Sequence, residues 1–257
     1  MSMDDDTARL LASLTGAFYR TCAASFSATR QRPWHGFEQL AATLSLDRSE
    51  RLDLFDLACG NLRFERFAAS LRNGLPLRVW ACDNAPELVQ GGWDAVQGEL
   101  RFQQLDIVGA LVHGAAPLSS LLDAPPCDLS VCFGFLHHVP RLACRAQVLE
   151  ALLDKTRVGG LVAVSFWRFM DDTRLAAKAR EATGRAQERF GPLSLEKGDY
   201  LLGWKERDDV YRYCHHFGDD ELAELEAGMQ GRARLVADFS ADGKSGALNR
   251  YLVWQRR

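Results

Sequence analysis

An acidic residue followed by small residues closes the first strongly apolar segment of the chain. Asp56 lies near the end of the run Leu52–Ala58, Gly60 and Asn61 follow, and a helical pattern then begins. This order is typical of a buried parallel strand that turns tightly into a helix. Small residues in the turn let the backbone approach a ligand closely. The acidic group suits a cationic or hydroxyl-rich ligand better than a phosphate.

Three later strand ends carry residues that can also contact a ligand through a carboxylate or through the backbone. Ligands of open α/β sheets bind outside the carboxyl ends of the strands, so residues at these ends should meet at one edge. The expected groups are Asp83 with Asn84, Asp106 with Ile107, and Phe133.

These residues suit S-adenosylmethionine as cofactor. The carboxylate of Asp83 can accept both ribose hydroxyls, and Asp106 can accept the adenine amino group while the Ile107 amide reaches a ring nitrogen. Backbone near Gly60 and the Phe133 carbonyl can hold the amino-acid end. The predicted cofactor site also includes Asp56, Ala58, Asn61 and Asn84.

The alternation of strand and helix patterns predicts an α/β fold with a doubly wound, seven-stranded, mostly parallel sheet. A helical cap should precede the sheet, and an insertion should separate the fifth and sixth strands. Expected strands are Leu52–Ala58, Leu77–Cys82, Leu100–Leu105, Asp128–Phe133, Leu161–Phe166, Ala233–Phe239 and Tyr251–Gln255, the last two antiparallel; expected helices are 7–30, Phe37–Leu44, Phe64–Arg72, Ala85–Val89 and Arg141–Arg157.

We expect a single domain with four segments: a helical cap (7–48), a cofactor-binding core (50–167), a substrate-recognition insertion (168–216) and a closing helix with a hairpin (217–257). A structural subdomain that covers the sheet edge is the alternative reading of the insertion.

The composition is that of an ordinary globular chain. Of its 257 residues, 47% are hydrophobic and 25% are charged, and the net charge of −3 creates no general attraction for nucleic acid. No apolar run is long enough to span a membrane, and the first residues are acidic where a secretory signal is basic. The seven cysteines lack C-x-x-C spacing, so we expect reduced, buried thiols and a cytoplasmic protein.

Several segments resemble those of a known protein family. The segments 198–204 (GDYLLGW) and 212–222 (RYCHHFGDDEL), together with Leu136-His137-His138-Val139, resemble the tRNA wobble-uridine carboxymethyl methyltransferases, within the class I S-adenosylmethionine-dependent methyltransferases. Phe18-Tyr19 and the segment 26–30 (FSATR) resemble the N-terminal cap helix of bacterial relatives and add Tyr19 and Arg30 to the expected cofactor site. Where the family has glycines this chain has Ala58 and Leu62, and Gly203 and Cys214 replace a proline and a tyrosine.

The resemblance implies methyl transfer to the carboxylate of 5-carboxymethyluridine in the anticodon loop of tRNA. It also implies a small zinc-binding activator protein as a possible partner. A carboxylate nucleophile is already anionic, so positioning does most of the catalytic work. Arg212 is the first candidate to orient it, with Arg30 second. His138 and His215 are candidates to orient substrate, or to act as bases towards a hydroxyl or amine.

Two other functions fit the same residues. One is methyl transfer to a small-molecule carboxylate, hydroxyl or amine, and the other is a non-catalytic, cofactor-binding activator subunit. His137 or His138 could equally be structural, and Tyr19, Trp34 and Trp167 could line a pocket or the core. No third ligand at familiar spacing accompanies His215-His216, so no metal site is predicted.

Overall fold

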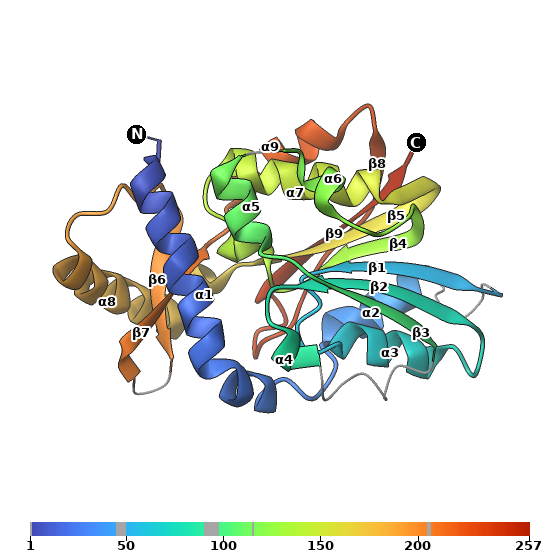
Figure 1. Ribbon diagram of the computed structural model, residues 1–257, viewed down its shortest axis with the longest axis horizontal. Coiled ribbons are helices and arrows are strands. Elements are labelled where there is room, and N and C mark those ends of the chain that lie inside the picture. The colour runs from blue at the N-terminus through green and yellow to red at the C-terminus, as the bar shows by residue number, and fades with distance from the viewer. Residues whose placement is uncertain (1, 45–49, 90–97, 115, 205–206) are drawn as a thin grey trace.

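The computed structural model describes residues 2–44, 50–89, 98–114, 116–204 and 207–257 (Figure 1). Seven strands form one sheet in the order β3-β2-β1-β4-β5-β9-β8. The first five strands are parallel to one another, and β9 is antiparallel to both β5 and β8. The strands are β1 (Leu52–Leu57), β2 (Leu77–Asp83), β3 (Glu99–Gln104), β4 (Cys127–Cys132), β5 (Thr156–Trp167), β8 (Ala233–Ala241) and β9 (Asn249–Arg256). This arrangement confirms the predicted fold class.

Helices cover both faces of the sheet (Figure 1). Because side chains of a strand alternate between faces, Phe55 and Leu57 of β1 pack under one layer while Leu52 and Leu54 pack under the other. The first layer holds α5 (Ile107–His113), α6 (Leu118–Leu121), α7 (Leu142–Asp154) and α9 (Asp219–Met229); the second holds α2 (His35–Leu44) and α3 (Arg63–Leu71). The short helix α4 (Pro86–Val89) follows β2.

A smaller layer stands beside the sheet and is built from the N-terminal helix and the insertion (Figure 1). The insertion contains α8 (Thr173–Phe190) and an antiparallel hairpin of β6 (Asp199–Trp204) and β7 (Arg207–His215). The helix α1 (Asp5–Ala28) packs against β7, where the Tyr213 amide donates to Thr15 Oγ1 at 3.0 Å. The sequence patterns did not predict the hairpin.

Two predicted boundaries differ from the structure by three residues or more. The helix expected to reach Arg157 ends at Asp154, and β5 begins at Thr156 rather than Leu161. The Thr156 hydroxyl donates to Ser130 Oγ of β4 at 2.7 Å, and Thr156 pairs with Cys127 of the same strand. The chain has therefore already entered the sheet at Thr156. The helices α5 and α6 were also missed, because each is too short to show a helical period.

All seven cysteines are buried and none forms a disulfide, as expected. Among the described residues, no helix is both long enough and apolar enough to cross a membrane.

Candidate functional site

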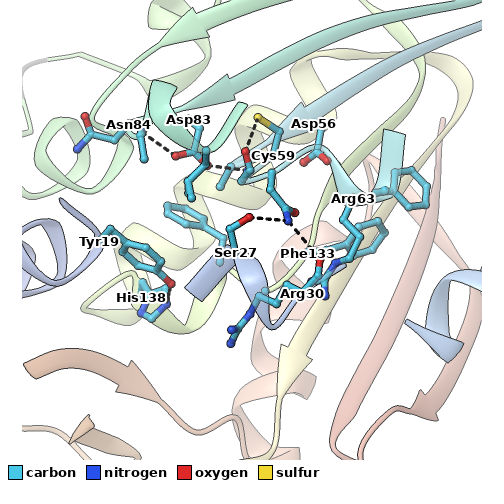
Figure 2. A pocket seen from close by; sticks show the side chains of 18 of the residues that line it. Tyr19, Ser27, Arg30, Asp56, Cys59, Arg63, Asp83, Asn84, Phe133 and His138 are labelled. Atoms are coloured by element: carbon cyan, nitrogen blue, oxygen red, sulfur yellow. Dashed lines mark hydrogen bonds between the residues drawn. The ribbon is translucent and has the colours of Figure 1, made fainter. Parts of the chain in front are cut away.

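One cavity of about 1230 Å³ lies between the carboxyl ends of the parallel strands and the cap formed by α1 and the segment after it (Figure 2). Its position is the point between β1 and β4 where the strand order reverses. Every residue predicted to bind the cofactor lines it: Asp56, Ala58, Gly60, Asn61, Asp83, Asn84, Asp106, Ile107, Phe133, Tyr19 and Arg30. Trp34 and Trp167 line it as well.

The turn after β1 has a left-handed backbone at three alternate positions. The φ angles are +69° at Ala58, +56° at Gly60 and +56° at Leu62. Two successive amides, those of Ala58 and Cys59, donate to the Cys82 carbonyl and fasten the turn to β2. A Cβ on Gly60 would meet nothing within 4 Å, so the turn presents open backbone to the cavity there. The turn keeps the glycine-rich conformation even where Ala58 and Leu62 replace glycine.

Asp83 organises the neighbouring strand end. Its Oδ2 accepts the Gly60 amide and its Oδ1 accepts the Ala85 amide, both at 2.9 Å. Each oxygen of a carboxylate can accept a second hydrogen bond, so the geometry leaves the predicted ribose contacts possible. Burial raises the pKa of this carboxyl, while the backbone amides oppose the shift.

Asp106 is the N-cap of α5, since its carboxylate accepts the Gly109 amide at 2.9 Å. The Ile107 amide, predicted to reach an adenine nitrogen, donates to the Leu105 carbonyl at 3.1 Å. Both residues lie on the cavity wall, but their contacts in this structure are local ones.

The cap is joined directly to the turn after β1. Asn61 Nδ2 donates to Ser27 Oγ at 3.1 Å and to the Arg30 carbonyl at 3.2 Å (Figure 2). The Arg63 guanidinium lies 4.2 Å from the centre of the Trp34 ring and adds a cation–π contact. The turn after β1 and the segment after α1 are therefore directly connected across the cavity.

His138 has both ring nitrogens engaged. Its Nδ1 is 2.7 Å from the Tyr213 carbonyl, which only accepts, so Nδ1 carries the proton. Nε2 is therefore an acceptor, and the Tyr19 hydroxyl donates to it at 2.8 Å (Figure 2). Burial, with the nearby charge of Arg212, lowers the pKa of His138 to about 3. The imidazole is neutral at physiological pH and is a weak base.

Arginines and aromatic rings form the cap side of the cavity. Arg212, on β7, is 93% buried, and its guanidinium carbon lies 4.7 Å from the centre of the Phe18 ring and 5.5 Å from that of Trp204. Arg30 lies 5.7 Å from the centre of the same Trp204 ring. Burial lowers the pKa of Arg30 to about 10, which leaves it charged. Two cations thus face the cavity from the side opposite the strand-end carboxylates.

His215 does not line the cavity. Its ring lies between two acidic residues, with Nδ1 2.7 Å from Asp199 Oδ1 and Nε2 2.5 Å from Glu221 Oε2. Although burial opposes the charged form, the two carboxylates raise the pKa of His215. Arg145 donates to Glu221 at 2.7 Å and extends this network into α7. The proposed catalytic role of His215 has no support in this placement, because its neighbours occupy both nitrogens.

Among the described residues, one group of metal-ligand types gathers: His137, His138 and Cys214, with ligand atoms within 4.8 Å of one another. The charges of Arg212 and Arg30 act on both imidazoles and disfavour a further cation. Both nitrogens of His138 are also engaged in hydrogen bonds. The group therefore gives no support for a metal centre.

Sequence reasoning missed Glu65, on the first turn of α3. It is fully buried beside Asp56, and its signal was only a charged residue within an amphipathic helix. Asp242 was also missed. Its carboxylate accepts from the Gly36 amide, Asn249 Nδ2 and the Tyr251 hydroxyl, which ties the last hairpin to α2.

No protein-family model and no curated protein sequence matches this chain. Solved structures do match. An S-adenosylmethionine-dependent methyltransferase from Methanosarcina mazei has a TM-score of 0.59 at 16% identity, over 83% of this chain and 96% of that one. DhpI in complex with S-adenosylhomocysteine has a TM-score of 0.58 at 15% identity, over 96% and 97%.

A further match is the magnesium protoporphyrin IX methyltransferase of Synechocystis with bound S-adenosylhomocysteine. Its TM-score is 0.54 at 12% identity, over 86% of this chain and 82% of that one. At these identities the likeness concerns the fold. The chain has the fold of class I S-adenosylmethionine-dependent methyltransferases.

Proposed function

We propose that this protein is an S-adenosylmethionine-dependent methyltransferase whose acceptor is an anion. The observation that carries the proposal is the division of charge in one cavity. Carboxylates of Asp56, Asp83 and Asp106 line the strand ends, and Arg30 and Arg212 face them from the cap. A cationic cofactor and an anionic acceptor would each meet the opposite charge.

The residues of the site fit this cofactor. Asp56 Oδ1 is buried, accepts no hydrogen bond from any described residue, and lies beside the open backbone of the turn. The cavity, at about 1230 Å³, exceeds the roughly 300–1,000 Å³ of most ligand pockets, so it has room for an acceptor as well. S-adenosylmethionine, when bound, supplies an electrophilic methyl group on a sulfonium.

The chain's own residues would then position the acceptor. A guanidinium offers a bidentate fork to a carboxylate, which makes Arg212 the first candidate to orient it and Arg30 the second. An anionic nucleophile needs no base, which agrees with the low basicity of His138. Holding two reactants in line contributes up to roughly 7–11 kcal/mol to catalysis in favourable cases. Because Arg212 is buried and α1 covers the cavity, water would be excluded from the aligned reactants.

The acceptor we propose is the carboxylate of a 5-carboxymethyl-type wobble uridine in tRNA. In support, the segments that resemble the wobble-uridine enzymes meet at this cavity: Tyr19 and Arg30 from the cap, His138 after β4, and Trp204 and Arg212 from the hairpin. The zinc-binding activator protein implied by the resemblance stays a prediction.

A small-molecule carboxylate is the second candidate acceptor. The depth of the site favours it, because Arg212 is 93% buried and His138 is 97% buried. A tRNA base would have to leave its stack to reach these groups, whereas a metabolite of suitable size would not.

Mass spectrometry of tRNA nucleosides from a deletion strain and its parent tests the proposal. Accumulation of a free carboxymethyl-type uridine, with loss of its methyl ester, would support the tRNA acceptor. Unchanged nucleosides together with methyl transfer to a metabolite extract would favour the small-molecule acceptor. Cofactor binding without transfer to either would contradict an enzyme and favour a non-catalytic activator subunit.

A further inference from the structure

The carboxyl groups of Asp56 and Glu65 form a buried pair behind the cofactor cavity. Asp56 is on β1 and lines the cavity, whereas Glu65 lies on the first turn of α3 behind it. Asp56 is 97% buried and Glu65 is fully buried. Asp56 Oδ1 and both oxygens of Glu65 accept no hydrogen bond from any described donor. The neighbouring carboxyl group is therefore the remaining hydrogen-bond partner within reach of these atoms.

Two such carboxylates cannot both be ionised at low cost. Burial disfavours the charged form of each, and each negative charge disfavours the other. The two groups are close enough to hydrogen-bond once one of them is protonated, and a single shared proton satisfies both. Burial, with the charge of Glu65, raises the pKa of Asp56, and burial raises the pKa of Glu65 to about 7.

The other ionisable groups around the pair do not neutralise it. Asp83 from β2 adds negative charge, and the thiols of Cys59 and Cys132 are buried beside Asp56 and are neutral because burial raises their pKa. Arg66, next to Glu65 on α3, opposes the shift, but its guanidinium donates to the Asn61 carbonyl at 2.8 Å. A positive charge that neutralises the pair would therefore have to come from a ligand in the cavity.

We propose that Glu65 is a positioning residue that holds a proton on the Asp56–Glu65 pair until the cofactor binds. The inference rests on the proposed function, because it needs a ligand with an ammonium group. When the cationic amino-acid end reaches Asp56, the ionised form of the pair gains a counter-charge, and the shared proton leaves to the solvent. Cofactor binding is then coupled to proton release, and cofactor affinity increases as the pH rises through neutrality.

Calorimetry of S-adenosylhomocysteine binding tests the coupling, since this product carries the same ammonium group. The binding enthalpy is measured near pH 7 in two buffers with different ionisation enthalpies, which yields the number of protons released. We expect a fraction of a proton, up to one, for the wild type. Glu65→Gln should abolish the release, because the amide donates a permanent hydrogen bond to Asp56. Glu224→Gln, an exposed substitution on α9, is the matched control and should release as many protons as the wild type.

Binding without proton release, or equal release by Glu65→Gln, would overturn the inference while leaving the proposed function intact. Absence of any binding would instead count against the proposed function. A second measurement does not need the cofactor. A carboxyl pKa raised by folding destabilises the native state as the pH rises from the unfolded value to the folded one.

We therefore expect Glu65→Gln to gain stability relative to the wild type between about pH 5 and pH 8. The stability of the variant is compared with that of the wild type at each pH, because the buried neutral His137 and His138 make both proteins less stable in acid. That shared contribution cancels in the difference. A difference in melting temperature that does not change with pH would show that the pair holds no proton, and it would overturn the inference even in the absence of cofactor.

Discussion

Ala58 and Leu62 take the left-handed conformation that glycine adopts most readily. For a residue with a Cβ this costs roughly 1–2 kcal/mol. Leu62 is completely buried, so the apolar contacts of its side chain offset the cost. Ala58 is half-buried and has only a methyl group to contribute. The strain at Ala58 is therefore the one that a substitution can relieve.

We expect Ala58→Gly to raise the free energy of unfolding by up to about 1 kcal/mol, since the relief of strain exceeds the entropy that glycine adds to the unfolded chain. Urea denaturation measures the change. Ala223→Gly, at an exposed position in the interior of α9, is the control and should lose about 1 kcal/mol. If both variants lost similar stability, the backbone at Ala58 would not be strained.

The buried cation Arg212 is expected to orient the acceptor rather than to bind the cofactor. Arg212→Ala should leave the Kd of the cofactor unchanged and reduce the rate of methyl transfer at least about tenfold, because the acceptor loses its orienting cation. Arg207→Ala is the matched control, since Arg207 is an exposed residue of the same strand that pairs with Asp209. Calorimetry and a transfer assay on the identified acceptor separate the two effects. A weaker cofactor affinity would place Arg212 in the cofactor site instead.

Among the elements, β6, β7 and α9 are held together by a buried ionic network. His215 donates from both nitrogens, to Asp199 of β6 and to Glu221 of α9, so the geometry requires the charged imidazolium. Because its folded pKa is raised, the network stabilises the fold fully below the unfolded pKa of about 6.5. This contribution is lost as the pH rises through the folded pKa.

His215→Gln should therefore be less stable than the wild type by about 1–3 kcal/mol in mild acid, and the difference should shrink as the pH rises. Urea unfolding at a series of pH values measures it. His113→Gln, at an exposed position on α5, should show no such trend. A deficit that grew with pH would mean that His215 is neutral in the folded protein.

For the molecule as a whole, the cap lies over the edge of the sheet that forms the cavity and is hydrogen-bonded to it. Asn61 joins them through Ser27 and the Arg30 carbonyl, while Tyr19 joins α1 to His138. These hydrogen bonds connect the segment after α1 to the turn after β1.

We expect Asn61→Ala to speed proteolytic cleavage within residues 28–35 by up to about thirtyfold, because the loss of two hydrogen bonds of about 1 kcal/mol each raises the population of the open cap. Gln39→Ala, an exposed substitution on α2, is the control and should be cleaved at the wild-type rate. Equal rates for both variants would show that the cap is held by packing instead.

The sequence predicted the sheet and the strand-end residues well, because both depend on local periodicity. A strand buried on both faces is an apolar run, and a ligand-approaching turn needs small residues, so Asp56, Gly60, Asp83 and Asp106 were found without knowing the fold. The short helices α5 and α6 and the β6–β7 hairpin were not predicted, because their apolar residues recur over too few positions or too irregularly to show a helix or strand period.

What the sequence determined by itself was therefore the fold class, the edge of the sheet at which the cavity lies, and the residue types that line that edge. Tertiary structure alone decided which long-range partners each side chain meets. It placed Arg212 over the cavity and His215, three residues later on the opposite face of β7, in a buried network, because successive residues of a strand alternate in direction and only packing fixes what each direction meets. It also brought Glu65 behind Asp56, since a contact between a strand and the following helix depends on how the helix packs, which no spacing in the sequence records.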